Sequence, residues 1–392
     1  MNKVIIVGGV HHNALGIARV FGINGVRPYG ILISSSKNSN YVTSSKYWEK
    51  TYLVKDYSDA INCLIQEFGN EKEKPVVMPT SDGAGYAIDL VYNKLKGSFL
   101  LPHINHTQGL IAYLMDKMNQ YKWANSMGFR MAKTWEYNFS AEKFNFSEIV
   151  YPCIIKPVIS AEGEKLDIKK CQSEEELKRI IFSLKSKGYK RTLIQEYLKK
   201  DFEAELIGCI PERSTRIPYV FTKNVREWPP VGGTGSYHEF IMDKKLKHDA
   251  ESILKSIKEY GYVGNIDVEL FVIKGELILN EVNFRNSGDV YYCLYNQVFY
   301  PLFLYLDVTG QDTSSLNIEY GHESWPMNEL TDLRYVVYGR LSLLEWMKDN
   351  HRCHDYAVWL RSDLKPVFKR YWECLTLMFR KRKEQKEKLS EV

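Results

Sequence analysis

The sequence predicts two fold classes in one chain, an N-terminal α/β lobe followed by a larger α+β part. Strand-like runs alternate with helical patterns in the first part, which is typical of a parallel sheet. After residue 150 the strand-like runs are separated by longer polar connections. The 392 residues, 44% of them hydrophobic, suffice for two or three lobes. We therefore expect one domain over residues 1–109, a second over 110–310 with a small lobe at about 130–200, and a C-terminal extension over 311–392.

The composition argues against several classes of protein. The net charge of +5, from 53 Lys+Arg and 48 Asp+Glu, is too small to indicate nucleic-acid binding without a localised patch. The seven cysteines are odd in number and lack C-x-x-C spacing, so they indicate neither a disulfide framework nor a cysteine zinc site. The first apolar run is too short for a secretion signal, and no run reaches the ~20 apolar residues of a membrane span. We expect a cytoplasmic protein.

The first lobe carries its polar loops at the carboxyl ends of predicted strands, where open α/β sheets bind ligands. His11 and His12 lie in the first of these loops, although loop histidines are more often structural than substrate-binding. That loop lacks the G-x-G-x-x-G order, which argues against the alternative of a nicotinamide site. The predicted strands are 4–7, 29–33 and 75–78, the helix spans 14–21, and the loops span 8–13 and 79–83.

In the second part, a single helix is expected from Leu110 to Met127, ending at Gly128 as a C-cap. Cys153 belongs to a predicted core strand, so nucleophilic catalysis by its thiol is not expected. The expected strands are 153–157, 192–196, 203–209, 265–272 and 276–282.

Two acidic strands, 265–272 and 276–283, are separated by Lys274-Gly275, a short turn that predicts a β-hairpin. Glu281 and Asn283 project to one face because side chains alternate along a strand, and antiparallel pairing brings Glu269 towards them. Carboxylate and amide oxygens are the ligands that Mg²⁺ prefers. A magnesium site is therefore one interpretation; a solvated strand face with scattered acids is the other.

The segment Asn280-Glu281-Val282-Asn283-Phe284-Arg285 resembles the E-V-N-P-R motif of the ATP-grasp family, with Phe284 in place of proline. The resemblance implies an ATP-grasp fold with an N-terminal Rossmann-like pre-ATP-grasp domain and mixed α+β nucleotide-binding lobes. It also implies a Mg-ATP site, in which Mn²⁺ is an alternative metal. In this comparison the metal ligands are Glu269, Glu281 and Asn283, and Arg285 holds the reacting acyl phosphate.

Further segments resemble the family in the expected order along the chain. Asp116-Lys117 resembles the D-K segment and Ile155-Lys156-Pro157 the I-K-P strand, which implies phosphate contacts for both lysines. The loop 160–165 stands where the family has a Gly/Ser-rich phosphate loop, although Glu162 and Glu164 would repel phosphate. The remaining nucleotide residues implied by the resemblance are Ser160, Gly163 and Lys165 in this loop, Gln195, Glu196, Tyr197 and Leu198 at adenine, and Glu203, or the neighbouring Glu205, at the ribose.

Residues 222–235 form a predicted flexible, glycine-bearing segment that resembles the K-x-x-R region of carboxylate-amine ligases, D-aspartate ligases among them. Arg226 can pair bidentately with a carboxylate, whereas Lys223 acts as a mobile point charge. We expect both residues to act on the substrate carboxylate. The alternative is a surface loop with ordinary charges.

The resemblance as a whole implies an ATP-dependent carboxylate-amine or carboxylate-thiol ligase. A carboxylate would take the γ-phosphate of ATP to give an acyl phosphate, and an amine would then displace phosphate. Small carboxylate and amine substrates, a cell-envelope or surface-polysaccharide intermediate among them, are expected, and a homo-oligomer is possible. The alternative function is an ATP-binding module with little ligase chemistry.

The tail, residues 365–388, combines aromatic side chains with the basic run Arg380-Lys381-Arg382-Lys383. Such a basic amphipathic helix can lie on the inner face of an anionic membrane, which would make the protein peripheral. Packing of the apolar stripe on the chain's own surface is the more common outcome.

Overall fold

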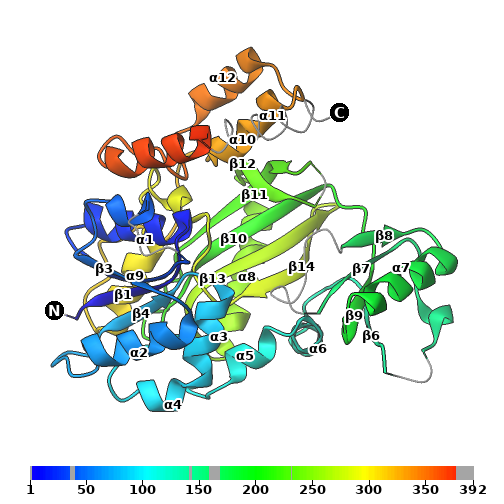
Figure 1. Cartoon of the computed structure of the whole chain (residues 1–392), viewed down its shortest axis with the longest axis horizontal. Coiled ribbons are helices and arrows are strands. Elements are labelled where there is room, and N and C mark those ends of the chain that lie inside the picture. Colours follow the sequence, from blue (N-terminus) through cyan, green and yellow to red (C-terminus); the bar gives the residue numbers. More distant parts are fainter. Residues whose placement is uncertain (1, 36–39, 141–143, 159–167, 231, 377–392) are drawn as a thin grey trace, which may run out of the picture.

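The computed structural model describes residues 2–35, 40–140, 144–158, 168–230 and 232–376. The described residues form three sheets, one in the N-terminal lobe, one in a small lobe, and a large central one between them (Figure 1). A block of short helices near the C-terminus lies beside the N-terminal lobe and one end of the large sheet (Figure 1). This arrangement agrees with the predicted succession of an α/β and an α+β part.

The N-terminal sheet is parallel, with the strand order β3-β2-β1-β4. Helix α1 begins at His12, where the His11 side chain accepts from the Asn13 amide, and helix α3 begins after the cap Ser81. The third strand was not predicted, because Lys50-Thr51-Tyr52 gives it a polar edge character. The elements are β1 (Val4–Gly9), α1 (His12–Ile23), β2 (Tyr29–Ile33), η1 (Val42–Ser44), β3 (Lys50–Val54), α2 (Tyr57–Phe68), β4 (Val76–Pro79), α3 (Asp82–Leu90) and α4 (Tyr92–Leu95).

The single helix expected over 110–127 is wrong, because the chain forms α5 (Leu110–Leu114) and α6 (Lys117–Ser126). Asp116 interrupts the helix: its carboxylate accepts from the amides of Met118 and Asn119 and so caps α6. The break places Lys117 in the first turn of a new helix. A two-residue strand, β5 (His103–Ile104), precedes α5 and pairs with the large sheet.

The small lobe is an antiparallel sheet of strand order β6-β9-β7-β8, covered by one helix. Its core joins Cys153 and Ile194 of the sheet to Leu177 and Ile181 of the helix. The elements are β6 (Thr134–Asn138), η2 (Phe146–Glu148), β7 (Cys153–Pro157), β8 (Lys169–Cys171), α7 (Glu174–Ser186) and β9 (Arg191–Glu196).

The large sheet has the strand order β12-β11-β10-β13-β14, all antiparallel. The predicted hairpin of the two acidic strands is confirmed, and both residues of its turn, Lys274 and Gly275, have positive φ. The elements are β10 (Phe202–Ile210), β11 (Tyr219–Trp228), β12 (Thr234–Phe240), α8 (Lys244–Glu259), β13 (Tyr262–Ile273), β14 (Glu276–Asn283), η5 (Val290–Cys293) and α9 (Tyr300–Val308).

The flexible segment predicted over 222–235 is also wrong in its larger part. It continues strand β11 to Trp228 and resumes as strand β12 at Thr234. Tyr219 and Phe221 anchor β11 in the core. The two strands pair from Thr222, opposite Phe240, to Trp228, opposite Thr234, despite a bulge beside Arg226.

The C-terminal extension packs on the rest of the chain. Arg19 of α1 lies fully buried against Asp363, with Nε 3.1 Å from Oδ2. The tail is helical over 364–376, where Val367 is buried, whereas the basic run at 380–383 lies outside the described residues. None of the described helices is long and apolar enough to cross a membrane. The other helices of the extension are α10 (Glu329–Asp332), α11 (Arg334–Val337) and α12 (Leu343–Arg352).

Candidate functional site

A row of carboxylates crosses the large sheet at one level. The register pairs Glu205 of β10 with Glu269 of β13, and Glu269 with Glu281 of β14. Two residues along, Asp267 stands opposite Asn283. The alternation of side chains in paired strands puts these groups on one face, as the sequence predicted for Glu269, Glu281 and Asn283.

Two lysines face this row from other elements. Lys117, in the first turn of α6, places Nζ 2.6 Å from Oε2 of Glu281. Lys156, on β7 of the small lobe, donates to Oε1 of Gln195 over 2.9 Å. Lys117, Lys156 and Gln195 line one small cleft together with Asn280, between the two lobes. The structure therefore brings together three residues that lie far apart in the sequence.

Two charged groups in this cleft, Lys156 and Glu269, have no ion-pair partner among the described residues. Burial lowers the pKa of Lys156 to about 8, with help from the neighbouring Lys117. Burial raises the pKa of Glu269 to about 7, and Glu281 and Asp267 add to the effect. For Glu281 burial acts in the same direction, but Lys117 and Lys156 outweigh it and lower the pKa. A bound anion would therefore stabilise the charged form of the two lysines, and a bound cation would stabilise the charged form of the two glutamates.

The donor set at the hairpin fits a hard divalent cation. Glu269 and Glu281 offer carboxylate oxygens, and Asn283 offers an amide that is 7% exposed. The Nδ2 atom of Asn283 is buried without a hydrogen-bond partner among the described residues. Oxygen ligands of this kind are those that Mg²⁺ prefers. The residues present therefore fit the expected metal.

Arg285 follows the hairpin and joins it to the N-terminal lobe. Its Nε lies 2.9 Å from Oδ1 of Asp82 and its Nη1 lies 2.5 Å from Oδ2 of Asp267. Burial opposes the charge, but Asp267 and Asp82 outweigh it and raise the pKa of Arg285. Phe284, which stands where the motif has proline, is buried against Trp123 and Tyr262. The departure from the motif thus serves core packing beside the site.

The residues expected at adenine and ribose lie at the end of β9 and the start of β10. Glu196 and Tyr197 are partly exposed there, and Lys170 lies over the Tyr197 ring. Glu203 is ion-paired with Lys200 and accepts a 3.4 Å bond from Asn224. Leu198 follows Tyr197 directly, and Ser160, Gly163 and Lys165 lie outside the described residues.

The two cations expected at the substrate carboxylate are engaged elsewhere. Lys223 lies 2.9 Å from Glu239 across the β11–β12 pair. Arg226 lies 2.8 Å from Asp332 and 2.6 Å from Asp349, both in the C-terminal extension. The structure does not bring them to the carboxylate row.

Two acids that the sequence reasoning did not assign to catalysis, Glu205 and Asp289, lie together near Asp267. Burial, then Asp289 and Asp267, raises the pKa of Glu205 well above its usual range. Burial also raises the pKa of Asp289, to about 6. Ser287 donates to Glu205 over 2.9 Å. The polar run Asn286-Ser287-Gly288-Asp289, directly after the motif, was the sequence feature that could have indicated Asp289 as a site residue.

His11 and His12 lie near this acid pair. A side chain at Gly288 would come 3.5 Å from Nε2 of His12 and 3.7 Å from His11. Burial lowers the pKa of His11 to about 4, and His12 is shifted the same way. The cap that His11 provides for α1 agrees with the structural interpretation of these histidines.

Known proteins resemble the chain over the same region. The family model of the ATP-grasp domain matches residues 123–296. A formate-dependent phosphoribosylglycinamide formyltransferase of Methanococcus maripaludis is 28% identical over 229 residues, which cover 55% of each chain. One of Wigglesworthia glossinidia brevipalpis is 27% identical over 196 residues, 47% of this chain and 45% of that one. The chain thus spans about half the length of these curated relatives.

Solved structures share the fold at low identity. An N5-carboxyaminoimidazole ribonucleotide synthetase with bound ADP superposes with a TM-score of 0.65 at 16% identity, covering 86% of this chain and 85% of that one. An L-amino acid ligase from Bacillus licheniformis gives 0.62 at 13% identity, with 83% and 79% covered. At these identities the likeness carries the fold alone. The chain therefore has an ATP-grasp fold, and its residues 123–296 match the model of the ATP-grasp domain.

Proposed function

We propose that the chain is an ATP-dependent ligase that activates a carboxylate as an acyl phosphate and joins it to an amine. ATP with Mg²⁺ is the cofactor of ATP-grasp enzymes. The observation that carries the proposal is that Lys156 and Glu269 are desolvated in the cleft and have no ion-pair partner among the described residues. Lys156 has only an amide oxygen as hydrogen-bond partner among the described residues, and Glu269 is kept from ionising fully at neutral pH. In Mg-ATP, the phosphates supply negative charge to Lys156 and the Mg²⁺ ion supplies positive charge to Glu269.

In this proposal each residue has one role in the first step. Glu269, Glu281 and Asn283 hold the metal, which neutralises the phosphates when bound. Lys117 and Lys156 contact phosphate, and Arg285 holds the acyl phosphate. A substrate carboxylate oxygen attacks the γ-phosphorus, and the bond to the bridging oxygen breaks to release ADP. Gln195 to Leu198 hold adenine, Glu203 holds the ribose, and the phosphate loop contributes Ser160, Gly163 and Lys165.

The acid pair Glu205 and Asp289 favours an amine over a thiol as the second substrate. Two desolvated carboxyl groups with raised pKa values gain stability when an ammonium group lies between them. Once the amine has lost a proton to this pair, its nitrogen attacks the acyl carbon and inorganic phosphate leaves. A thiol would gain nothing from these charges.

The proposal names the two substrates by chemical class alone, as a carboxylate and an amine. The relatives and structures described above are named for formyl transfer, carboxyaminoimidazole ribonucleotide synthesis and amino-acid ligation. None of these names refers to cell-envelope assembly or to a membrane. The cell-envelope intermediate expected from the sequence, and the contact of the tail with a membrane, gain no support from them.

The test is a phosphate-release screen of the full chain that pairs small carboxylates with small amines in the presence of Mg-ATP. We expect ADP formation that requires a particular carboxylate, and an amide product only when an amine is added. Hydroxylamine in place of the amine should trap the acyl phosphate as a hydroxamate. Tight Mg-ATP binding with no carboxylate-dependent ADP formation would favour the ATP-binding module instead.

A further inference from the structure

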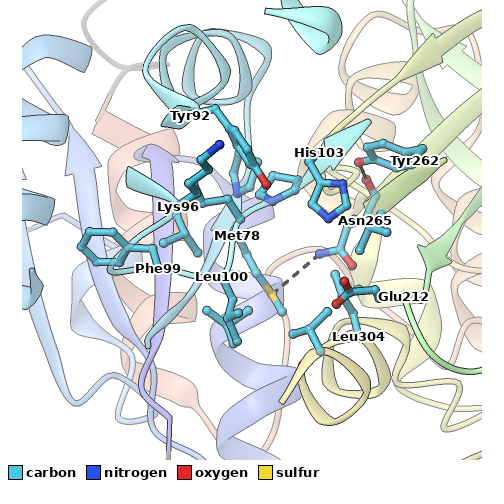
Figure 2. Close-up of a pocket in the computed structure, with 18 of the residues that line it drawn as sticks. Met78, Tyr92, Lys96, Phe99, Leu100, His103, Glu212, Tyr262, Asn265 and Leu304 are labelled. Atoms are coloured by element: carbon cyan, nitrogen blue, oxygen red, sulfur yellow. Dashed lines mark hydrogen bonds between the residues drawn. The ribbon is translucent and has the colours of Figure 1, made fainter. Parts of the chain in front are cut away.

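A second hollow lies between the N-terminal lobe and the large sheet (Figure 2). It shares no lining residue with the cleft of Lys117 and Lys156, although Arg285 lines it. It is a cavity of about 310 Å³ whose walls are mostly apolar. Met78, Leu100 and Leu304 come from β4, the segment before β5, and α9. Polar groups converge on one side, where Figure 2 shows His103, Asn265 and Glu212 facing the hollow. A few polar groups in an apolar pocket are the usual make-up of a ligand site.

The turn after β5 is strained in a way that brings two imidazoles together. Asn105 and His106 both have positive φ, 48° and 54°, and the Thr107 amide donates to the Ile104 carbonyl over 2.9 Å. A left-handed backbone is costly for residues other than glycine, and such strain clusters at functional sites. The turn is held by two bonds from Asn105 to residues 260 and 261. As a result the rings of His103 and His106 lie 3.8 Å apart.

Glu212 completes a group of three metal-binding side chains. It follows β10, and its backbone amide donates to Asp307 over 2.6 Å, which fixes its position. The ligand atoms of His103, His106 and Glu212 all lie within 4.8 Å of one another. Ligands about 2.1 Å from a tetrahedral metal are about 3.4 Å apart, so small rotations of the exposed His106 and Glu212 side chains would close the set.

We propose that His103, His106 and Glu212 bind a divalent transition metal, Zn²⁺ being the best match, at the wall of this cavity. Two imidazole nitrogens and one carboxylate oxygen are a donor set that zinc takes when one coordination position stays open. This set differs in kind from the all-oxygen set of Glu269, Glu281 and Asn283, which suits Mg²⁺. The two sites would therefore select different metals.

The surroundings of the three residues fit a metal site with an open position. The Tyr92 hydroxyl lies 2.9 Å from Nδ1 of His106, a contact that orients the ring and leaves Nε2 for a metal. Asn265 is 5% exposed, and its Oδ1 has no hydrogen-bond partner among the described residues. Its Nδ2 reaches only the Met78 sulfur, at 3.8 Å. A water or small ligand on the open position would lie in the cavity that Asn265 also faces.

The experiment is a calorimetric titration of the untagged, metal-free full chain with Zn²⁺, compared with His103→Gln, His106→Gln and Glu212→Gln. We expect each substitution to weaken binding by at least about 10–100-fold, because loss of a mere supporting group already has this effect and each variant loses a metal ligand itself. His106 and Glu212 are exposed, so their variants should fold even if His103→Gln does not. His248→Gln, on helix α8, is the matched control and should bind as the unchanged chain does.

Two further measurements exclude Zn²⁺ binding by cysteines and by the ATP cleft. Co²⁺ loading should give a spectrum without a thiolate charge-transfer band, because none of the seven cysteines belongs to the proposed site. Glu281→Gln should leave Zn²⁺ binding intact, which separates this site from the ATP cleft. The proposal is overturned if the three variants bind Zn²⁺ as tightly as the unchanged chain, or if the unchanged chain binds none. Either result leaves the ligase proposal untouched.

Discussion

Two hairpins of the same sheet carry charged residues to very different surroundings. Glu281 of the β13–β14 hairpin is ion-paired with Lys117, whereas Glu269 beside it has no such partner among the described residues. Lys156, which faces this hairpin from β7, has the amide oxygen of Gln195 as its hydrogen-bond partner. In the β11–β12 hairpin, Arg226 lies between Asp332 and Asp349, and Lys223 is paired with Glu239. Both segments were expected from the sequence to be functional, yet among the described residues only the first lies beside charged groups, Lys156 and Glu269, that have no ion-pair partner.

The comparison distinguishes a cation whose partner is a ligand, Lys156, from a cation whose ion pairs stabilise the fold, Arg226. A buried charge without an ion-pair partner costs stability, so its presence indicates a ligand of opposite charge. Arg226 already has two carboxylate partners, Asp332 and Asp349, and removing it would leave these acids without their guanidinium partner. The five predictions below start from this distinction and run from the largest expected effect on turnover to the smallest.

Glu281→Gln should lower ATP turnover by about 10²–10³-fold, because it removes a metal ligand that acts on the transferring phosphate. The measurement is ADP release with saturating substrates and Mg²⁺. Glu276→Gln is the matched control on the same strand, since Glu276 pairs with Arg130 at the exposed end of the hairpin. Full turnover of Glu281→Gln would show that the metal site has been placed wrongly.

Lys156→Met should raise the KM for ATP by about 10–50-fold, because a desolvated charge next to phosphate is lost. The free protein should become more stable at pH 7, by up to about 3 kcal/mol, since burial lowers the pKa of Lys156 from 10.5 to about 8. Urea unfolding without nucleotide measures this. A variant that loses both affinity and stability would contradict the view of Lys156 as a cation awaiting phosphate.

The KM for ATP and the stability of the free protein should both depend on pH through Lys156. The folded chain holds the Lys156 proton below pH 8 and loses it as the pH rises through 8, so the KM for ATP should increase above that pH. Between about pH 8 and 10.5 the unfolded chain binds more protons than the folded one, so the contribution to stability rises with pH. Lys156→Met should lack both trends.

The hairpin of Glu269 and Glu281 could be predicted because its signals are local. Strand alternation and a Lys-Gly turn fix which residues share a face, and the motif adds their chemistry. The same holds for Lys156, a lysine in an apolar strand. These residues needed no knowledge of the rest of the chain.

The errors arose where distant residues decide the outcome. Nothing near Arg226 indicates that Asp332 and Asp349 will reach it from the C-terminal extension, so a charged strand was mistaken for a flexible loop. The cap that Asp116 forms is local, but it competes with a continuous apolar pattern that favours one helix. The pairing of Glu205 with Asp289 depends on how β10 meets the loop after β14.

Asp289→Asn should raise the KM for the amine by about tenfold and leave the KM for the carboxylate within about twofold, because it removes a charge that faces only the second substrate in our proposal. Burial raises the pKa of Asp289 to about 6, so in the unchanged chain amine affinity should fall as the pH drops through 6. The variant should lack this decrease. Equal changes in both KM values would mean that Asp289 positions the whole site.

Arg226→Met should have the smallest effect on turnover and a large effect on stability. Asp332 is fully buried and would lose its guanidinium partner, which costs about 3–5 kcal/mol for a broken buried pair. Turnover per folded molecule should stay within about twofold of the unchanged chain. The measurements are the urea midpoint and the KM for the carboxylate.

Two companion variants show whether Arg226 is structural or contacts substrate. Lys223→Met, on the same strand but half-exposed, should change stability by less than about 1 kcal/mol. The double variant Arg226→Met with Asp332→Leu should recover most of the lost stability, because it no longer leaves an unpaired buried acid. If the double variant folds well but its KM for the carboxylate rises tenfold or more, Arg226 binds substrate as the sequence suggested. If the KM is unchanged, Arg226 acts through its ion pairs with Asp332 and Asp349 and has no role in substrate binding.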